Sequence, residues 1–338
     1  MKRYIYRFVI LSIIFSSCNP ENDINPESSR FYLHENGVTC MCPNTRPGEK
    51  GMIDGLEYES VDNQLIRQRR DEGVDMTKLC TSLVTDMNKL FAGDENITTN
   101  VFDLRNKFNQ PIGNWDVSNV VDMSDMFNFS NFDQPIGEWD VSNVTNMSAM
   151  FTTGIFNQSI ESWDVGNVTN MRGMFYQSEF NQPIGAWDVS NVLDMYAMFI
   201  FTQFNQPIGD WDVSSVKDMR AMFWQTSFNQ PIGDWDVSSV TDMMGIFYDT
   251  PFNHPIGNWN VGNVTDMESM FDDSNFNQPI GDWDVSSVTN MENMFYGSIF
   301  NQDISKWCVT KITSEPLDFS IYAPLTEANK PIWGTCPG

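Results

Sequence analysis

The chain has 338 residues, of which 41% are hydrophobic and 13% aromatic, so it carries enough apolar material to bury a core and lacks the composition of a disordered protein. Its formal net charge of −26 arises from 45 acidic and 19 basic residues. This balance argues against nucleic acid, and against an anionic membrane surface for the folded part, because both are bound through Lys and Arg. Cations, basic protein surfaces and neutral sugars remain as candidate ligands.

The N-terminus has the features of a secretory signal. Lys2 and Arg3 form a basic start, and the apolar run from Phe8 to Phe15 is too short to span a membrane. Two serines then lead to Cys18, at the place where a bacterial lipoprotein signal positions its acylated cysteine. We therefore expect a lipoprotein signal peptide over residues 1–17 and lipidation at Cys18. An ordinary signal peptide with an unrelated cysteine is the alternative.

Residues 18–30 are polar and acidic and contain two prolines, a composition typical of a flexible tether. A tether that follows an acylated cysteine would hold the next domain away from a membrane. We expect the protein in the cell envelope, anchored by lipid alone in the outer membrane and exposed at the surface.

Five further cysteines are compatible with disulfides after export. Cys308 and Cys336 both lie near the end of the chain, so the simplest pairing joins them. Cys80 then pairs with Cys42 or Cys40, which leaves one thiol over. A metal site built from those three cysteines is the competing interpretation, and it is disfavoured because neither of the two histidines belongs to the cluster.

Residues 31–107 do not follow the period of the rest of the chain. The segment MIDGLEYESV predicts a hairpin around Asp54 and Gly55. The segment LVTDMNKLF, from Leu83 to Phe91, matches the second half of a repeat. We expect this region to be an N-terminal cap that contains a hairpin and half a repeat.

Residues 108–307 repeat every 24 residues. Nine phenylalanines run at this spacing from Phe108 to Phe300, and nine tryptophans from Trp115 to Trp307, without one insertion. The stretch FNQPIGDWDVSSV occurs three times unchanged. Constant period is typical of a solenoid, in which each coil buries its apolar edge against a coil of equal length.

Within one coil the apolar pattern predicts two short elements. Val120, Met123, Met126 and Phe127 are spaced as on one face of a two-turn helix, with Ser118 or Asn119 as its N-cap. Residues 109–112 predict a short parallel strand, kept short by a proline column that cannot donate to a ladder. The phenylalanine and tryptophan columns are expected to form the core. The predicted fold class is thus an α/β repeat solenoid, with short parallel strands and short helices in nine coils between two caps.

Polar residues also recur in columns. One asparagine column begins at Asn109 and a glutamine column follows it, which predicts ladders of side-chain hydrogen bonds; a recognition strip is the alternative. Two aspartate-rich columns suit Asx turns, in which backbone N–H groups offset the stacked charges. Calcium bound by Asp188, Asp212 and Asp236 is the alternative for an acidic exported repeat. The expectation is no metal and no cofactor.

Two columns change from coil to coil, which marks them as solvent-facing. They contain Tyr176, Tyr196, Trp224 and Tyr248, and exposed aromatic residues are favoured at interfaces. These four residues are therefore candidates for a partner-binding surface. The alternative is that they merely cover neighbouring turns.

The repeat FNQPIGNWDVSNVTxMxxMF closely resembles that of BspA-like leucine-rich-repeat surface proteins, and LVTDM and WGTCP resemble the flanking segments of bacterial members. The resemblance covers roughly residues 35–338. It implies a leucine-rich-repeat-like, right-handed parallel solenoid at the cell surface, with adhesion or protein binding as its role, and it supplies no catalytic residues. Residues 308–338 diverge from the repeat and are expected to form a C-terminal cap with a disulfide.

Three functions follow from these observations. A binding module would contact a host, matrix or neighbouring-cell protein or glycan. A structural spacer or envelope scaffold, stabilised in one version by calcium, is the second. An enzyme is the least favoured, because catalysis needs a unique cluster of acids and bases, whereas the acids here form columns in which no coil differs from the rest.

Overall fold

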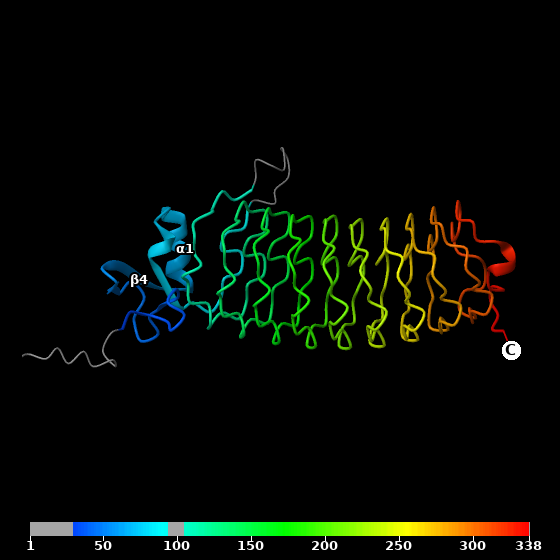
Figure 1. Cartoon of the computed structure of the whole chain (residues 1–338), viewed down its shortest axis with the longest axis horizontal. Helices are drawn as coiled ribbons and strands as arrows, with labels where there is room; N and C mark the ends of the chain where they lie inside the picture. Colours follow the sequence, from blue (N-terminus) through cyan, green and yellow to red (C-terminus); the bar gives the residue numbers. More distant parts are fainter. Residues whose placement is uncertain (1–29, 94–104, 338) are drawn as a thin grey trace, which may run out of the picture.

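The structure is a computed structural model that describes residues 30–93 and 105–337. The predicted signal peptide, Cys18 and nearly all of the tether lie outside the described residues. The described chain forms an elongated stack of coils (Figure 1). Helix α1 (Asn63–Glu72) and strand β4 (Leu56–Asp62) close one end of the stack, and the C-terminus lies at the other. No helix in the described part is both long and apolar enough to cross a membrane.

The N-terminal cap contains two small sheets. Strands β1 (Tyr32–Leu33) and β2 (Cys40–Met41) pair antiparallel. Strand β3 (Lys50–Ile53) pairs antiparallel with β4, and β4 pairs parallel with β5 (Leu79–Leu83), which follows the 3₁₀ turn η1 (Met76–Lys78). The predicted hairpin is confirmed.

The turn of this hairpin uses Asp54 and Gly55, with φ of 49° and 79°. Positive φ at both central residues is what a two-residue turn of this hand requires. Helix α1 begins at the Asp62 cap and ends at Gly73, where φ is 69°. Its Arg67 and Arg70 donate to backbone carbonyls of Asn88 and Leu90, at 2.9 and 2.8 Å, and so join the helix to the predicted half repeat.

The second half of each coil is a series of tight turns, and the helix predicted over residues 120–127 is wrong. In the coil that begins at Phe108, four alternate residues from Met123 to Phe129 donate backbone N–H groups to the next coil, at 2.9–3.0 Å. The residues between them donate within their own coil, as Met126 does to the Met123 carbonyl at 3.2 Å. Successive three-residue turns therefore produce the helix-like spacing of the apolar residues. The predicted N-cap role of Ser118 or Asn119 falls with the helix.

Two positions of each turn series adopt the left-handed conformation. In the same coil they are Asp125 and Phe129, with φ of 55° and 49°, and the neighbouring coils repeat them. Alanine, serine and glutamine occupy these positions elsewhere in the stack, so glycine does not mark them in the sequence. Each non-glycine residue there costs on the order of 1 kcal/mol.

The strand predicted over residues 109–112 is also absent. Successive coils share only single parallel bridges, which run from Asp86–Asp122 to Asp266–Asn290. At the position of the expected strand, side chains make the connection. The Asn109 side-chain oxygen accepts from the backbone N–H of Asp133 and from the side-chain amide of Gln134, at 3.0 and 3.1 Å. This bonding repeats along the stack, as the structural interpretation of the amide columns predicts.

The aromatic columns form the core, as predicted. All nine tryptophans of the repeat are at most 4% exposed. Each indole N–H donates to an earlier part of the stack, as Trp139 does to the Ile112 carbonyl at 3.2 Å. Two phenylalanine columns stack beside them, with Phe151 and Phe156 ring centroids 4.1 Å apart. The buried aromatic surface and the intercoil bonds thus involve the same residues.

Both ends of the stack are closed by chain segments that imitate a coil. The predicted half repeat is confirmed, because Met87 and Phe91 donate to the Asp122 and Met126 carbonyls as one coil does to the next. At the other end, the carbonyls of Phe319 and Ile321 accept from Phe295 and Gly297 of the eighth coil. The 3₁₀ turn η3 (Glu327–Asn329) follows.

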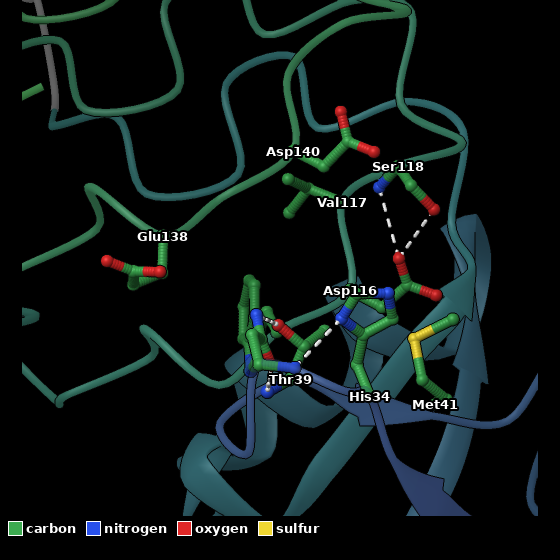
Figure 2. A pocket seen from close by; sticks show the side chains of 10 residues that line it. His34, Thr39, Met41, Asp116, Val117, Ser118, Glu138 and Asp140 are labelled. Atoms are coloured by element: carbon green, nitrogen blue, oxygen red, sulfur yellow. Dashed lines mark hydrogen bonds between the residues drawn. The ribbon is translucent and has the colours of Figure 1, made fainter. Parts of the chain in front are cut away.

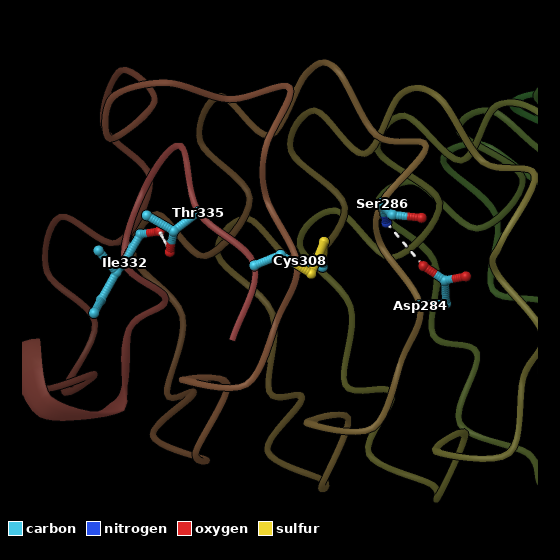
Figure 3. The surroundings of a disulfide bond; sticks show 6 residues. Asp284, Ser286, Cys308, Ile332 and Thr335 are labelled. Atoms are coloured by element: carbon cyan, nitrogen blue, oxygen red, sulfur yellow. Dashed lines mark hydrogen bonds between the residues drawn. A yellow bond between two sulfur atoms is a disulfide. The ribbon is translucent and has the colours of Figure 1, made fainter. Parts of the chain in front are cut away.

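Cys308 and Cys336 lie at disulfide-bonding distance in the C-terminal segment (Figure 3), and the predicted bond would fasten this segment to the stack. Cys308 occupies the position directly after tryptophan, where the preceding coil has Asp284. Asp284 accepts from the Ser286 N–H at 3.0 Å, so the last coil exchanges a turn-capping carboxylate for the cysteine of the predicted bond.

Candidate functional site

The four aromatic candidates form one surface, which we call the aromatic ridge: Tyr176, Tyr196, Trp224 and Tyr248, joined by Phe201, Arg172 and Arg220. Trp224 stacks on Tyr248 with ring centroids 4.0 Å apart. Tyr176 contacts Phe201 edge to face at 6.1 Å. All four predicted residues are half-buried, so they cover neighbouring turns and still present part of each ring to solvent.

Two arginines flank Tyr196. The guanidinium carbons of Arg172 and Arg220 lie 3.9 and 5.0 Å from its ring centroid, a cation–π arrangement. Arg220 also pairs with Asp218 at 2.6 Å, and this hydrogen bond raises the pKa of the guanidinium further above its usual range. Neither arginine is among the partner-binding residues predicted from the sequence, although both stand in the same variable column as Tyr196.

Small residues beneath the ridge give its rings their positions. Ala197, Ile200 and Ala221 form a buried cluster against which Tyr176, Tyr196 and Trp224 pack. A Cβ at Gly245 would lie 2.6 Å from two ring carbons of Trp224. The tryptophan therefore lies flat on a backbone that has no side chain at that point. The ridge is a packed surface whose ring orientations are set by the residues beneath it.

The prediction that the variable columns face solvent is wrong at several positions. Ser124, Ile200 and Asp272 are 5%, 7% and 7% exposed. Burial raises the pKa of Asp272 to about 6, partly opposed by a hydrogen bond from Ser269 and reinforced by the negative charge of Asp273. One Asp272 oxygen has no hydrogen-bond partner. Variation in these columns therefore reflects local packing as well as exposure.

The aspartate column after tryptophan caps turns. Asp188, Asp212 and Asp236 each accept from the backbone N–H two residues later, at 3.0–3.1 Å. Hydrogen bonds from Ser190 and Ser238 lower the pKa of Asp188 and Asp236. Among residues 30–93 and 105–337, no three His, Cys, Asp or Glu side chains are grouped in a way that could hold a metal ion.

The three remaining cysteines meet inside the cap. Cys40, Cys42 and Cys80 are fully buried, and the Cys80 thiol donates to the Cys40 carbonyl at 3.0 Å. A hydrogen bond from Cys80 lowers the pKa of the Cys42 thiol to about 6, while burial raises that of Cys80. No disulfide joins these residues in the structure. Their contact is the one that pairing of Cys80 with Cys42 or Cys40 requires, and the pairing stays a prediction.

Comparison with known proteins gives one match. The sequence model of a protein family matches residues 63–177, 96–203, 152–251 and 225–327, which together span residues 63–327. No curated protein and no solved structure matches the chain. By the extent of the match, the chain belongs to the family described as Mycoplasma protein of unknown function, DUF285.

Proposed function

We propose that this chain is a non-catalytic binding module, held at the bacterial surface by a lipid on Cys18, whose solenoid contacts a macromolecular partner through the aromatic ridge. The partner is a protein or glycan of a host, a matrix or a neighbouring cell. The proposal includes the finer family resemblance, to BspA-like proteins with a right-handed, leucine-rich-repeat-like coil. It needs neither a cofactor nor a metal.

The observation that carries the proposal is local variation on a constant scaffold. The core columns repeat with only conservative apolar changes, whereas the ridge concentrates Tyr176, Tyr196 and Trp224 with two arginines in successive coils. Tyrosine, tryptophan and arginine are the residues enriched among interface hot spots. Because the rings already stack on one another, ordering them when a partner binds would cost little conformational entropy.

The test of location is protease shaving of intact cells, with a periplasmic protein as the control. Release or degradation of the solenoid while the control survives supports exposure at the surface. Protection would overturn the adhesive role and favour an internal scaffold. Replacement of Cys18 by Ser is expected to move the protein from the membrane fraction to the soluble fraction.

The test of the ridge uses substitutions that the chain itself contains in the same columns. Tyr196→Ser and Trp224→Thr restore the residues found at Ser148 and Thr152. Leu193→Thr is the matched control, because Leu193 is 44% exposed and its column carries threonine in other coils. In a screen against matrix proteins and glycans, loss of binding in the ridge variants alone is expected. Equal binding by all variants would contradict the proposal.

The second candidate is a structural spacer or envelope scaffold. The regular intercoil bonding favours it, because such a stack needs no partner to keep its shape. Its calcium-stabilised form would use Asp188, Asp212 and Asp236. A fall in melting temperature on addition of chelator would support that form, and an unchanged melting curve would remove it.

A further inference from the structure

A cavity of about 130 Å³ with both polar and apolar lining residues lies between the N-terminal cap and the first coils. The cap supplies His34, Thr39 and Met41, and the coils supply Asp116, Glu138 and Asp140 (Figure 2). This volume exceeds the space that one water molecule needs. The cavity is separate from the aromatic ridge, whose residues do not line it.

Asp116 is the unusual residue of this cavity. It belongs to the aspartate column that follows tryptophan, and the corresponding residues of the next seven coils are exposed. Asp116 is 3% exposed, because the cap is bonded to the first coil on both sides of it. The Cys40 N–H donates to the Asn114 carbonyl at 2.8 Å, and the Thr81 hydroxyl donates to the Asp116 carbonyl at 2.9 Å.

The two oxygens of the Asp116 carboxylate have different surroundings. Oδ1 accepts from the Ser118 N–H and hydroxyl, at 3.1 and 2.6 Å, as aspartates of this column do elsewhere (Figure 2). Oδ2 is buried and has no hydrogen-bond partner. A buried carboxylate oxygen without a partner is strongly unfavourable unless a cation or a donor reaches it.

The remaining lining suits a polyatomic cation. Glu138 and Asp140 add two carboxylates from the second coil, no Lys or Arg lines the cavity, and the one basic side chain in its lining is the imidazole of His34. Met41 provides a thioether, against which an organic cation packs well. A guanidinium offers five N–H donors in one plane and can reach acceptors on more than one element.

We propose that this cavity binds the cationic end of an arginine or lysine side chain from a protein partner, with Asp116 as its principal acceptor and Glu138 and Asp140 at the rim. The site recognises positive charge, which fits a protein with a net charge of −26. It is independent of the ridge, so either site can fail without the other.

The experiment is calorimetric titration of the purified full chain with four probes: N-acetyl-argininamide, N-acetyl-lysinamide, the uncharged N-acetyl-citrullinamide and calcium chloride. Saturable binding of one or both cationic amides is expected, and their relative affinity identifies the side chain. The Asp116→Asn variant is expected to bind about tenfold more weakly, as loss of a charge-assisted bond implies. The Asp212→Asn variant is the matched control, since Asn260 shows that the column accepts asparagine, and its affinity is expected to be unchanged.

Four results would overturn the proposal: no saturable binding of either cation, equal affinity of Asp116→Asn, equal binding of the citrulline probe, or calcium binding that displaces the amides. If circular dichroism shows that Asp116→Asn does not fold, Glu138→Gln replaces it. That rim variant is expected to weaken binding about two- to fivefold, and an unchanged affinity would count against the site. Because the cationic probe binds only the folded state, it should also raise the melting temperature of the wild type.

Discussion

Replacing Gly245 by alanine tests whether the ridge is held rigidly before binding. The new Cβ would lie 2.6 Å from two ring carbons of Trp224, so the indole must move off the backbone and away from Tyr248. Gly173→Ala is a matched control. Gly173 occupies the equivalent position three coils earlier, with φ of 59° against 61° at Gly245, and a Cβ there would have its nearest neighbour 3.9 Å away.

The expected free energies differ between the two variants. Gly173→Ala meets only the strain of a left-handed alanine, about 1 kcal/mol, which Ala197 and Ala221 already tolerate. Gly245→Ala meets the same strain and also disrupts the Trp224–Tyr248 pair. That pair contributes about 0.5–1.5 kcal/mol beyond its buried area, so a total loss of about 2–4 kcal/mol is expected.

Urea denaturation followed by circular dichroism measures both variants, and tryptophan emission reports the displaced indole. The dependence of the unfolding free energy on urea concentration must have the same slope in both variants before their denaturation midpoints are compared, because repeat proteins do not always unfold in one step. If the two variants differ by less than about 0.5 kcal/mol, the ring moves without cost and the ridge is not preorganised. The binding screen on the same variants then shows whether ring position matters to the partner.

Asn205→Asp is expected to change the free energy of unfolding by less than about 0.5 kcal/mol, because the Asn205 side chain bonds to the next coil only through its oxygen, which aspartate retains. Asn205→Ala removes that oxygen and should cost about 1 kcal/mol in thermal melts. Equal losses in the two variants would contradict the side-chain ladder. The pKa of Asp272 is about 6 in the folded protein, above its ordinary 3.8. The stability that its protonated form contributes is therefore fully present below pH 4 and is lost as the pH rises through 6. Asp272→Asn should therefore stabilise the protein at pH 7, by at most about 3 kcal/mol. It should also flatten the dependence of the unfolding free energy on pH between 4 and 7, and an unchanged pH profile would refute the raised pKa of Asp272. Non-reducing peptide mapping of the exported protein should find Cys308 joined to Cys336 and Cys80 joined to one of its two cysteine neighbours, whereas free Cys80 after unfolding would exclude the second bond.

The period of 24 residues was sufficient to predict the solenoid, its aromatic core and the half repeat that begins it. These follow from which residues must be buried between equal coils. The periodicity did not distinguish a helix from a series of turns, because both place apolar residues three apart at Val120, Met123 and Met126. A helix and a series of turns differ in the carbonyls to which their backbone N–H groups donate. In this chain half of those carbonyls belong to the neighbouring coil.

The glycine that follows isoleucine shows the same limit. It occurs in seven of the nine coils, and Glu161 and Ser305 replace it in the other two. The sequence shows this preference, for example at Gly185, without its cause. A Cβ there would lie 2.6 Å from the Pro207 carbonyl of the next coil, so the requirement is close approach between coils. The cavity at Asp116 was invisible for a related reason. It depends on how the cap docks on the first coil, and those residues are far apart in the sequence.

The turn series also gives the stack an electrical direction. In an ordinary sheet alternate peptide dipoles oppose one another and nearly cancel. Here the alternate N–H groups of the turn series bond within their own coil, and the other four point toward the C-terminal end, as at Met123 and Met147. One row just before the turn series, at Val121 and Thr145, points the opposite way. Four rows of peptide dipoles, against one, thus align along the axis, as they do in a helix. The capped end that carries Asp116 is the negative pole, which adds to its attraction for a cation.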